Sequence, residues 1–329
     1  MYTIRHKKGE LRNASDLKEY KNIMRHPLLA KKHNALTFHS LVYFHECHSL
    51  YFSLTKDYKN DVYHIENLIK LMESNEHHIA ENPSAYMIVL TNFIGTQIWL
   101  KNYSKASLYL EKLRSLVPRS ERLKNKLFQN RAVLEFTIYI ETGQFNKGLP
   151  LIKEIRDELD KSDGGLLKNN IIIEMLLAFN AFCIYFGLGD YKDAKLWLNK
   201  ILNDGSLDRR VDLLCFARIM NLILHFELGD QEALEHITRS TYRFLYKRER
   251  LYKMETIILH FIRNKMPKMN SPKEFIEAFK ELKKEFIKLS EDTFEKNVFE
   301  YFDFISWLES KIEKRSFSEI VKEKAGKGQ

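Results

Sequence analysis

The chain has 329 residues, of which 44% are hydrophobic and 12% aromatic, and its formal net charge is +9. A chain of this length and apolar content can bury a large core, and its 12 glycines and 6 prolines are too few for a β-rich fold with long loops, so we predict an all-α protein. The positive charge permits an acidic protein, nucleic acid or a membrane surface as partner, but requires none of them.

Residues 1–34 are predicted to form an N-terminal segment with one leading helix over residues 17–26, and a second helix is expected over residues 35–54. The second helix contains His45 and His48, which share a helix face and are half of a possible metal site. No third or fourth ligand is apparent and aromatic residues flank the pair, so we interpret both histidines as packing residues. We predict no metal and no other cofactor.

The three cysteines, Cys47, Cys183 and Cys215, all fall inside predicted helices and include no C-x-x-C pair. They are expected to be buried thiols in a reducing compartment, which favours a cytoplasmic protein. The N-terminal segment has no apolar run typical of a secretory signal. The richest apolar stretch, residues 171–186, is interrupted by Glu174 and Asn180, so we expect no membrane partner.

A turn between two amphipathic helices recurs along the chain. Each copy reads Gly or Lys, then Asp, Asn or Gln, then an aromatic residue in four of five copies. The copies begin at Lys56, Lys101, Gly143, Gly189 and Gly229, with spacings of 45, 42, 46 and 40 residues. Glycine suits the left-handed conformation that ends a helix, and the acid or amide after it can cap the next helix.

The second helix of each unit also has a pattern. Three residues after the aromatic comes a small residue in three copies, Ala106, Gly148 and Ala194, whereas the first copy has Asp61. A small residue allows two helices to approach closely. Seven residues after the aromatic comes Ile or Leu in four copies. Both positions are therefore expected to face the partner helix.

This pattern resembles the tetratricopeptide repeat, whose second half reads Gly-x-Tyr-x-x-Ala. Gly189, Tyr191 and Ala194 match that half, and Asn92 and Asn180 match the asparagine that the family often places eleven residues before the tyrosine. The spacing here is longer than the family's period of about 34 residues. The resemblance covers residues 35–265 and concerns the fold more than any activity.

The resemblance implies a right-handed α–α superhelix of about five antiparallel helix pairs, whose first helices line a concave face. We therefore expect a non-catalytic scaffold that binds another protein or a peptide. Polar residues of the first helices are the candidate contacts: Asn92, Asn130, Arg131, Glu135, Asn180, Arg218 and Asn221. For Asn92 and Asn180, a structural role between neighbouring helices is the alternative.

Residues 239–253 contain a cluster of cations. Arg239, Arg243, Lys247 and Arg250 recur at helical spacing and predict one basic stripe, with Tyr242, Leu245 and Tyr246 facing elsewhere. Three interpretations stay open: a solvated outer face, a site for an acidic protein, and a nucleic-acid site, the last of which a charge run alone supports poorly.

The C-terminal part begins with Ser271, Pro272 and Glu274, which combine a capping serine, a proline at the first helical position and a capping-box glutamate. Residues 271–316 are predicted to form two capping helices, the second from about residue 294 to residue 312. Residues 317–329 are predicted to be a polar, frayed tail.

No motif of a known catalytic centre is present, so we predict that the chain is not an enzyme. Two alternatives remain. Bacterial regulators that sense short signalling peptides have repeats of similar length, although no effector domain has room before residue 35. A metal enzyme using His45 and His48 is the other. The partner's identity and the oligomeric state stay open.

Overall fold

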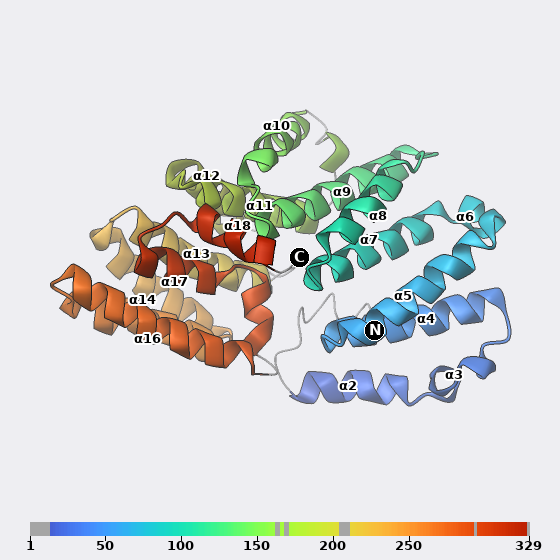
Figure 1. The fold of residues 1–329 in the computed structure, drawn as a ribbon, viewed down its shortest axis with the longest axis horizontal. Coiled ribbons are helices and arrows are strands. Elements are labelled where there is room, and N and C mark those ends of the chain that lie inside the picture. Colours follow the sequence, from blue (N-terminus) through green and yellow to red (C-terminus); the bar gives the residue numbers. More distant parts are fainter. Residues whose placement is uncertain (1–13, 162–164, 168–170, 204–210, 293–294, 328–329) are drawn as a thin grey trace. The chain divides into compact units, whose positions relative to one another are not determined.

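The structure is a computed structural model that describes residues 14–161, 165–167, 171–203, 211–292 and 295–327 (Figure 1). Within these ranges the chain forms helices and no β-strand, which confirms the all-α prediction. The chain divides into two compact units. Unit 1 comprises the described parts of residues 1–138 and 154–170, and unit 2 comprises those of residues 139–153 and 171–327. The single continuous superhelix stays a prediction.

Unit 1 begins with the short N-terminal helices and continues through two complete helix pairs. Its helices are α2 (Ala14–Met24), α3 (Pro27–Ala30), α4 (Phe38–Leu54), α5 (Tyr58–Glu73), α6 (Glu76–Glu81), α7 (Pro83–Trp99), α8 (Tyr103–Arg114) and most of α9 (Glu121–Glu141), with 3-10 turns η1 (Lys32–Asn34) and η3 (Gly165–Leu167). Helix α10 (Gly148–Leu159) is divided between the units, and its part from Glu154 onward belongs to unit 1.

Unit 2 contains two helix pairs followed by the C-terminal helices. Its helices are the first part of α10, α11 (Ile171–Leu188), α12 (Tyr191–Leu202), α13 (Val211–Glu227), α14 (Gln231–Lys247), α15 (Lys253–His260), α16 (Pro272–Ser290), α17 (Phe304–Glu313) and α18 (Phe317–Lys327). Its shorter turns are η2 (Phe145–Lys147), η4 (Phe261–Lys265), η5 (Met266–Lys268) and η6 (Glu295–Glu300).

All five predicted turns share one backbone geometry. The first residue of each turn has a φ between 57° and 77°: Lys56, Lys101, Gly143, Gly189 and Gly229. Its amide donates to the carbonyl three residues earlier at 2.8–3.2 Å, and the next amide donates to the carbonyl five residues earlier at 2.8–3.1 Å. These two bonds are the Schellman motif, which satisfies the last carbonyls of the preceding helix. The repeated turn is therefore a structural repeat as well as a sequence pattern.

The residue after the left-handed position caps the next helix in four copies. The side chains of Asp57, Asn102, Asp190 and Asp230 each accept a hydrogen bond from the amide three residues on, at 3.1–3.3 Å. Gln144 makes no such bond, and a 3-10 turn precedes α10 in that copy. Glutamine is a poor N-cap residue, so the third pair starts its second helix less regularly.

The predicted contact positions are buried in both units. Ala106 and Ala194 are fully buried, and a Cβ at Gly148 would lie 2.6 Å from the side chain of Ile184. In the first copy the same position holds Asp61, which is also fully buried. The Asp61 carboxylate is accommodated there because the hydroxyls of Ser49 and Thr96 donate hydrogen bonds to it.

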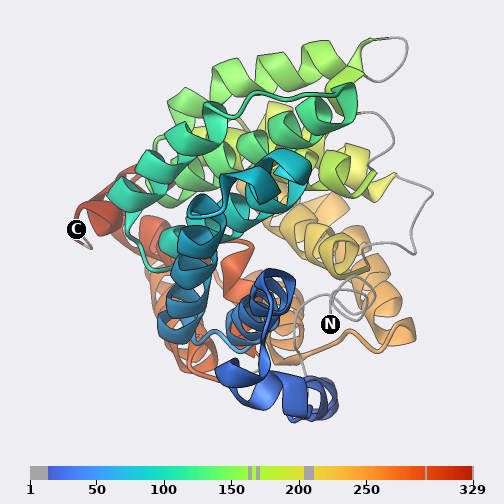
Figure 2. The same cartoon turned by 90° about the vertical axis from the view of Figure 1, so that its right-hand side faces the viewer.

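Two predictions for the C-terminal part were wrong. The helix expected from about residue 294 is divided, because the side chain of Asp303 accepts from the amide of Ser306 at 2.8 Å and starts α17 anew. The tail predicted as polar contains helix α18, with Ile320 and Val321 buried, and α18 packs against α11. The red helix α18 is visible in Figures 1 and 2. Residues 328 and 329 lie outside the described ranges.

Other predictions were confirmed. Helix α16 begins at Pro272, the hydroxyl of Ser271 accepts from the amide of Glu274 at 3.3 Å, and the Glu274 carboxylate accepts from the amide of Asn270 at 2.8 Å. The three cysteines lie in α4, α11 and α13 as predicted; Cys183 and Cys215 are buried, whereas Cys47 is only half-buried, and burial raises the pKa of all three thiols.

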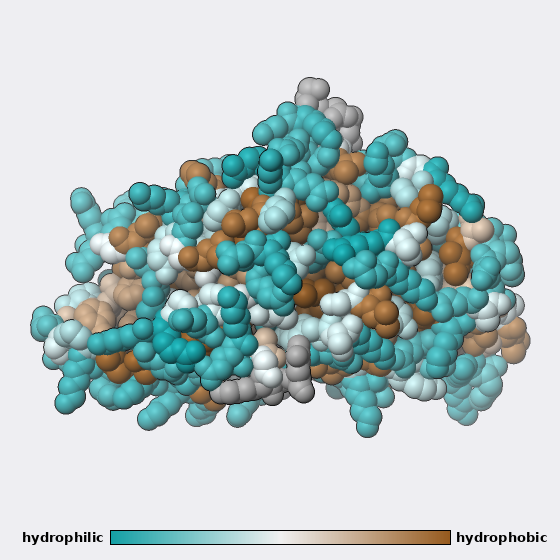
Figure 3. Space-filling view, turned by 45° about the horizontal axis from the view of Figure 1, so that its top comes forward, coloured by the Kyte–Doolittle hydropathy of each residue, from teal (hydrophilic) through white to brown (hydrophobic). Residues whose placement is uncertain are grey.

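Helix α11 is long and apolar enough to cross a membrane by length and composition, and 56% of that window is buried. Its buried side chains pack inside unit 2, largely against α12. The face drawn in Figure 3 has hydrophilic side chains interspersed with small groups of hydrophobic ones.

Candidate partner-binding site

Two of the predicted contact residues on α9 belong to an internal charge network in unit 1. The Glu135 side chain is 8% exposed, and its Oε1 lies 2.7 Å from Nη2 of Arg114 and 3.6 Å from Nε of Arg131. Nη2 of Arg131 also pairs with Glu154 at 2.8 Å. These charges satisfy one another, so Arg131 and Glu135 are better explained by stability than by partner contact.

The four predicted asparagines are not held in such networks. Asn92 on α7 is exposed, whereas Asn130, Asn180 and Asn221 are half-buried. None of the four side chains forms a hydrogen bond within the described part of the chain. The structural role considered for Asn92 and Asn180 requires such bonds between helices, so their amides are available for other contacts.

Three members of the predicted basic stripe lie together on α14, and the fourth does not. Arg239, Arg243 and Lys247 are exposed on this helix, which ends at Lys247. Glu249 then has a φ of 55°, so the backbone turns away before Arg250. The prediction that Arg250 continues the stripe was wrong for this reason. Its guanidinium lies 3.4 Å from the hydroxyl of Tyr252.

The orientation predicted for the two tyrosines was also wrong. Tyr242 is 43% exposed and Tyr246 is 66% exposed, and their rings stack with centroids 6.0 Å apart. Steps of three and four residues place them beside Arg239 and Arg243 on one helix face. We call Arg239, Tyr242, Arg243, Tyr246 and Lys247 the α14 face. Leu245 is buried, as an inward-facing residue should be.

Two cavities lie beside Arg239, Tyr242 and Arg243 of the α14 face, within unit 2. A cavity of about 360 Å³ is lined by Arg239, Tyr242 and Arg243 and, from the segment after α14, by His260 and Arg263. A second cavity of about 1160 Å³ shares part of this wall and extends to α16. Its far wall is apolar and includes Ile262, Met266, Met269 and Phe275. The two cavities therefore form one groove with a cationic part and an apolar part.

The groove has a charge gradient. Arg239 pairs with Glu235 at 3.2 Å, and both side chains are well exposed. Such a pair contributes little stability. Within the described residues, Arg243, Lys247 and Arg263 form no ion pair. The acids lie toward the start of α14, where the walls include Asp230, Glu232 and Glu235.

The acidic end is fixed by local hydrogen bonds. The carboxylate of Asp230 accepts from the amide of Ala233 at 3.1 Å, which is the largest cause of its lowered pKa, and Nδ1 of His225 lies 3.1 Å from Oδ2 of Asp230. Asp230 is therefore ionised near neutral pH. The groove is therefore cationic at one end and anionic at the other, so a ligand with a charge at one end binds better in one direction than in the other.

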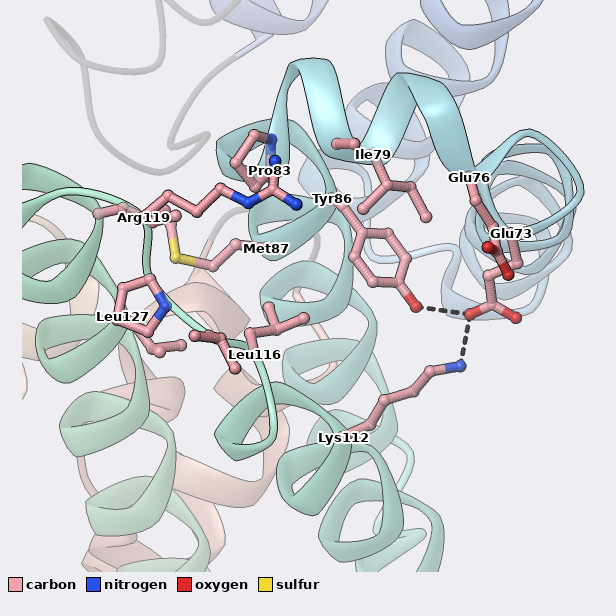
Figure 4. A pocket seen from close by; sticks show the side chains of 14 residues that line it. Glu73, Glu76, Ile79, Pro83, Tyr86, Met87, Lys112, Leu116, Arg119 and Leu127 are labelled. Atoms are coloured by element: carbon pink, nitrogen blue, oxygen red, sulfur yellow. Dashed lines mark hydrogen bonds and ion pairs between the residues drawn. The ribbon is translucent and has the colours of Figure 1, made fainter.

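Unit 1 has a separate pocket of about 590 Å³ (Figure 4). Oε1 of Glu73 accepts from the Tyr86 hydroxyl at 2.6 Å and from Nζ of Lys112 at 2.5 Å. Burial would raise the pKa of Glu73, but these hydrogen bonds lower it on balance. The three residues come from α5, α7 and α8, so the bonds tie three helices together. Glu73, Tyr86 and Lys112 therefore already satisfy one another, whereas Glu76 and Arg119 also line this pocket.

His45 and His48 of α4, considered above as half of a possible metal site, have separate partners in the structure. His45 is buried, and its Nδ1 lies 3.1 Å from Nδ1 of His64 on α5, whereas Nδ1 of His48 lies 2.8 Å from the carbonyl of Phe44. Burial, and then the charges of neighbouring groups, lower the pKa of His45 to about 4 and that of His64 to about 3. Among the described residues, no group of three or more His, Cys, Asp or Glu is placed to hold a metal.

The comparisons with known proteins returned no matching family model and no similar curated protein. The α14 face must therefore be assessed on its own chemistry. Sequence reasoning missed His260, the last residue of α15, and Arg263, in the π-helical turn η4 that follows. These residues reach the wall of the groove because this segment packs against α14, which is a contact between elements distant in the sequence. The sequence analysis had already identified Arg239, Arg243 and Lys247, and it could have added the tyrosines because each lies three residues after one of the two arginines.

Proposed function

We propose that this protein is a non-catalytic scaffold that binds an acidic, partly apolar segment of another protein in the groove along the α14 face. The observation that supports the proposal best is that exposed cations without ion pairs stand beside an apolar groove. Arginine donates two parallel hydrogen bonds to a carboxylate, and tyrosine provides a large contact area at low entropic cost.

The groove also defines how the segment lies. Its carboxylates face Arg243 and Arg263 in the groove, with the exposed Lys247 one helical turn beyond Arg243, and its apolar side chains occupy the part lined by Met269 and Phe275. Acidic residues of the segment avoid the start of α14, where Asp230 and its neighbours are negative. This gradient favours a peptide over nucleic acid, because a nucleic acid backbone is negative along its whole length.

A cytoplasmic location and a tetratricopeptide-like superhelix are part of the same proposal. The five identical turns support the repeat, because each one joins two successive helices in the same way. The exposed side chain of Asn92 supports a further contact surface on the first helices. Partner contact at that surface is a second, weaker candidate than binding at the α14 face.

Binding of short labelled peptides, followed by fluorescence anisotropy, tests the proposal. We expect a peptide alternating Glu with Leu or Phe to bind tighter than a Glu-Gly-Ser peptide of equal charge, and a neutral apolar peptide to bind weakest. Affinity of the acidic peptides should fall steeply with salt. Equal affinity for all three peptides, or preference for single-stranded nucleic acid of similar length, would overturn the proposal.

A further inference from the structure

Two arginines of unit 2 hold one aromatic ring between them. The ζ carbon of Arg218 on α13 lies 3.9 Å from the ring centroid of Phe244 on α14, and that of Arg248 lies 3.8 Å from the same centroid. Two flat guanidinium groups this close to one centroid would clash on the same face of the ring. They therefore occupy opposite faces, and we call Arg218, Phe244 and Arg248 the arginine clamp.

Among the described residues, no acidic side chain forms an ion pair with either arginine of the clamp. Neither guanidinium group forms an ion pair or a hydrogen bond with another described residue, and the Nε atom of Arg218 is buried without a partner. A buried donor without a partner is destabilising, and two nearby guanidinium groups repel each other. Burial first, and then the charge of Arg248, lower the pKa of Arg218.

The carboxylate of Asp212, at the start of the same helix α13, does not relieve this charge. Its Oδ2 accepts from the hydroxyl of Tyr301 at 2.8 Å. Arg218, Phe244 and Arg248 are all half-buried, so solvent reaches the clamp. An arginine pair that is partly desolvated, accessible and without an acid is suited to an anion from outside the chain.

We propose that the arginine clamp binds the oxyanion of a ligand at the edge of the Phe244 ring, with a phosphoryl group preferred over a carboxylate. The edge of an aromatic ring is electropositive, so it adds to the attraction of the two cations. Stacking on the ring also holds both guanidinium planes in place before the anion arrives.

A phosphoryl group fits this arrangement better because of its shape. Its terminal oxygens point in three directions and reach donors above and below the plane of the ring. The two oxygens of a carboxylate lie in one plane and favour a single guanidinium fork. Phosphoryl and carboxylate groups are both oxyanions, so the experiment below compares the two directly.

The clamp is distinct from the α14 face. Phe244 follows Arg243 by one residue, which is a rotation of about 100° around the helix. It therefore points toward α13, whereas Arg243 points to the groove. Oxyanion binding at the clamp does not require the proposed peptide binding, and either can fail alone.

The test is a titration of the full chain, labelled at the arginine Nε–H groups, with inorganic phosphate and with acetate at constant ionic strength. Phosphate should produce saturable NMR shifts of the Arg218 and Arg248 signals, with acetate at least about tenfold weaker. Acetate equal to or tighter than phosphate overturns the preference for a phosphoryl group. Small, non-saturating shifts shared by all exposed arginines would overturn the site itself.

Three variants, each checked for retained helicity by circular dichroism, sharpen this test. Arg248→Gln should weaken phosphate binding at least about tenfold, because one charged donor is lost. Phe244→Leu keeps both arginines but removes the ring that orients them, and should also weaken binding. Arg122→Gln, at an exposed position of α9 in unit 1, is the matched control and should bind phosphate as the parent does. Equal weakening in the control contradicts a defined clamp.

Discussion

The arginines of α9, in unit 1, and those of α14, in unit 2, have different surroundings. Arg131 is half-buried between Glu135 on its own helix and Glu154 on α10. Arg243 and Lys247 are exposed and have no acid opposite them among the described residues. Arginines at helical spacing are therefore structural where neighbouring elements supply carboxylates, and remain available for a partner where they do not.

A second comparison concerns the same repeat position in two pairs. Ala194, in unit 2, is a small buried residue. Asp61, in unit 1, is buried as well, but its Oδ1 accepts from the Ser49 hydroxyl at 2.6 Å and its Oδ2 from the Thr96 hydroxyl at 2.7 Å. Unit 1 thus uses polar residues to connect its helices, which leads to the following predictions.

The largest expected effect is on Asp61→Ala. The substitution leaves the buried Ser49 hydroxyl without its acceptor and leaves the Thr96 hydroxyl only the carbonyl of Asn92, and it should lower the free energy of unfolding by about 3 kcal/mol. Urea unfolding followed by circular dichroism measures this change. Asp157→Ala, an exposed position on α10, should change stability by less than about 0.5 kcal/mol. A loss at Asp61 as small as that of the control would contradict the structural role.

The next effect is a pH dependence of unit 1. Unfolded histidines titrate near their model value of 6.5, whereas the pKa in the folded state is about 4 for His45 and about 3 for His64. The unfolded state therefore binds more protons below pH 6.5. The stability that these residues contribute above pH 6.5 is lost as the pH falls toward 4, by on the order of 2 kcal/mol.

The control for this prediction is His64→Phe, which keeps an aromatic ring among Phe44, Phe52 and Tyr63 but cannot titrate. Its stability should depend less on pH between 6.5 and 4 than that of the parent protein. Parallel stability curves for parent and variant would show that the buried histidines are not responsible for the loss.

A somewhat smaller effect is expected for Glu135→Gln. The neutral side chain leaves Arg114 and Arg131 with less negative charge nearby, and should destabilise the protein by about 1–2 kcal/mol. Both arginines are partly exposed, which limits the loss. Thermal or urea unfolding checks this prediction, and a change within 0.5 kcal/mol would mean that the network is not structural.

The smallest effect on stability is expected for Arg243→Gln on the α14 face. This arginine has no ion pair with another described residue, so the free energy of unfolding should change by less than about 0.5 kcal/mol. Peptide affinity should nevertheless decrease. A stability loss equal to that of Glu135→Gln would contradict the distinction between structural arginines on α9 and available arginines on α14.

The sequence was sufficient for features that depend on local chemistry. The five turns were located correctly because a left-handed residue followed by a cap residue leaves a short pattern, as in Gly189 and Asp190. The start of α16 at Ser271 was predicted on the same basis.

Features that depend on distant contacts were not predictable. At the end of α14 the left-handed conformation is taken by Glu249 and not by a glycine. No stop signal was therefore visible in the sequence, and Arg250 was predicted to lie on the helix. The pairing of His45 with His64 depends on how α4 packs against α5. Similarly, the spacing of Arg131 gave no indication that Glu154 lies opposite. Whether a charged residue is free or paired is decided by such tertiary contacts.

The most direct test of the central claim is a charge reversal on the α14 face. The variant Arg239→Glu, Arg243→Glu, Lys247→Glu is compared with Lys280→Glu, Lys284→Glu, Lys288→Glu, which makes the same charge change on an exposed face of α16. With the acidic apolar peptide, we expect the first variant to lose at least about 100-fold in affinity and the second less than about threefold, with helicity retained in both. Equal affinity of the first variant and the parent, or equal losses in both variants, would contradict the account.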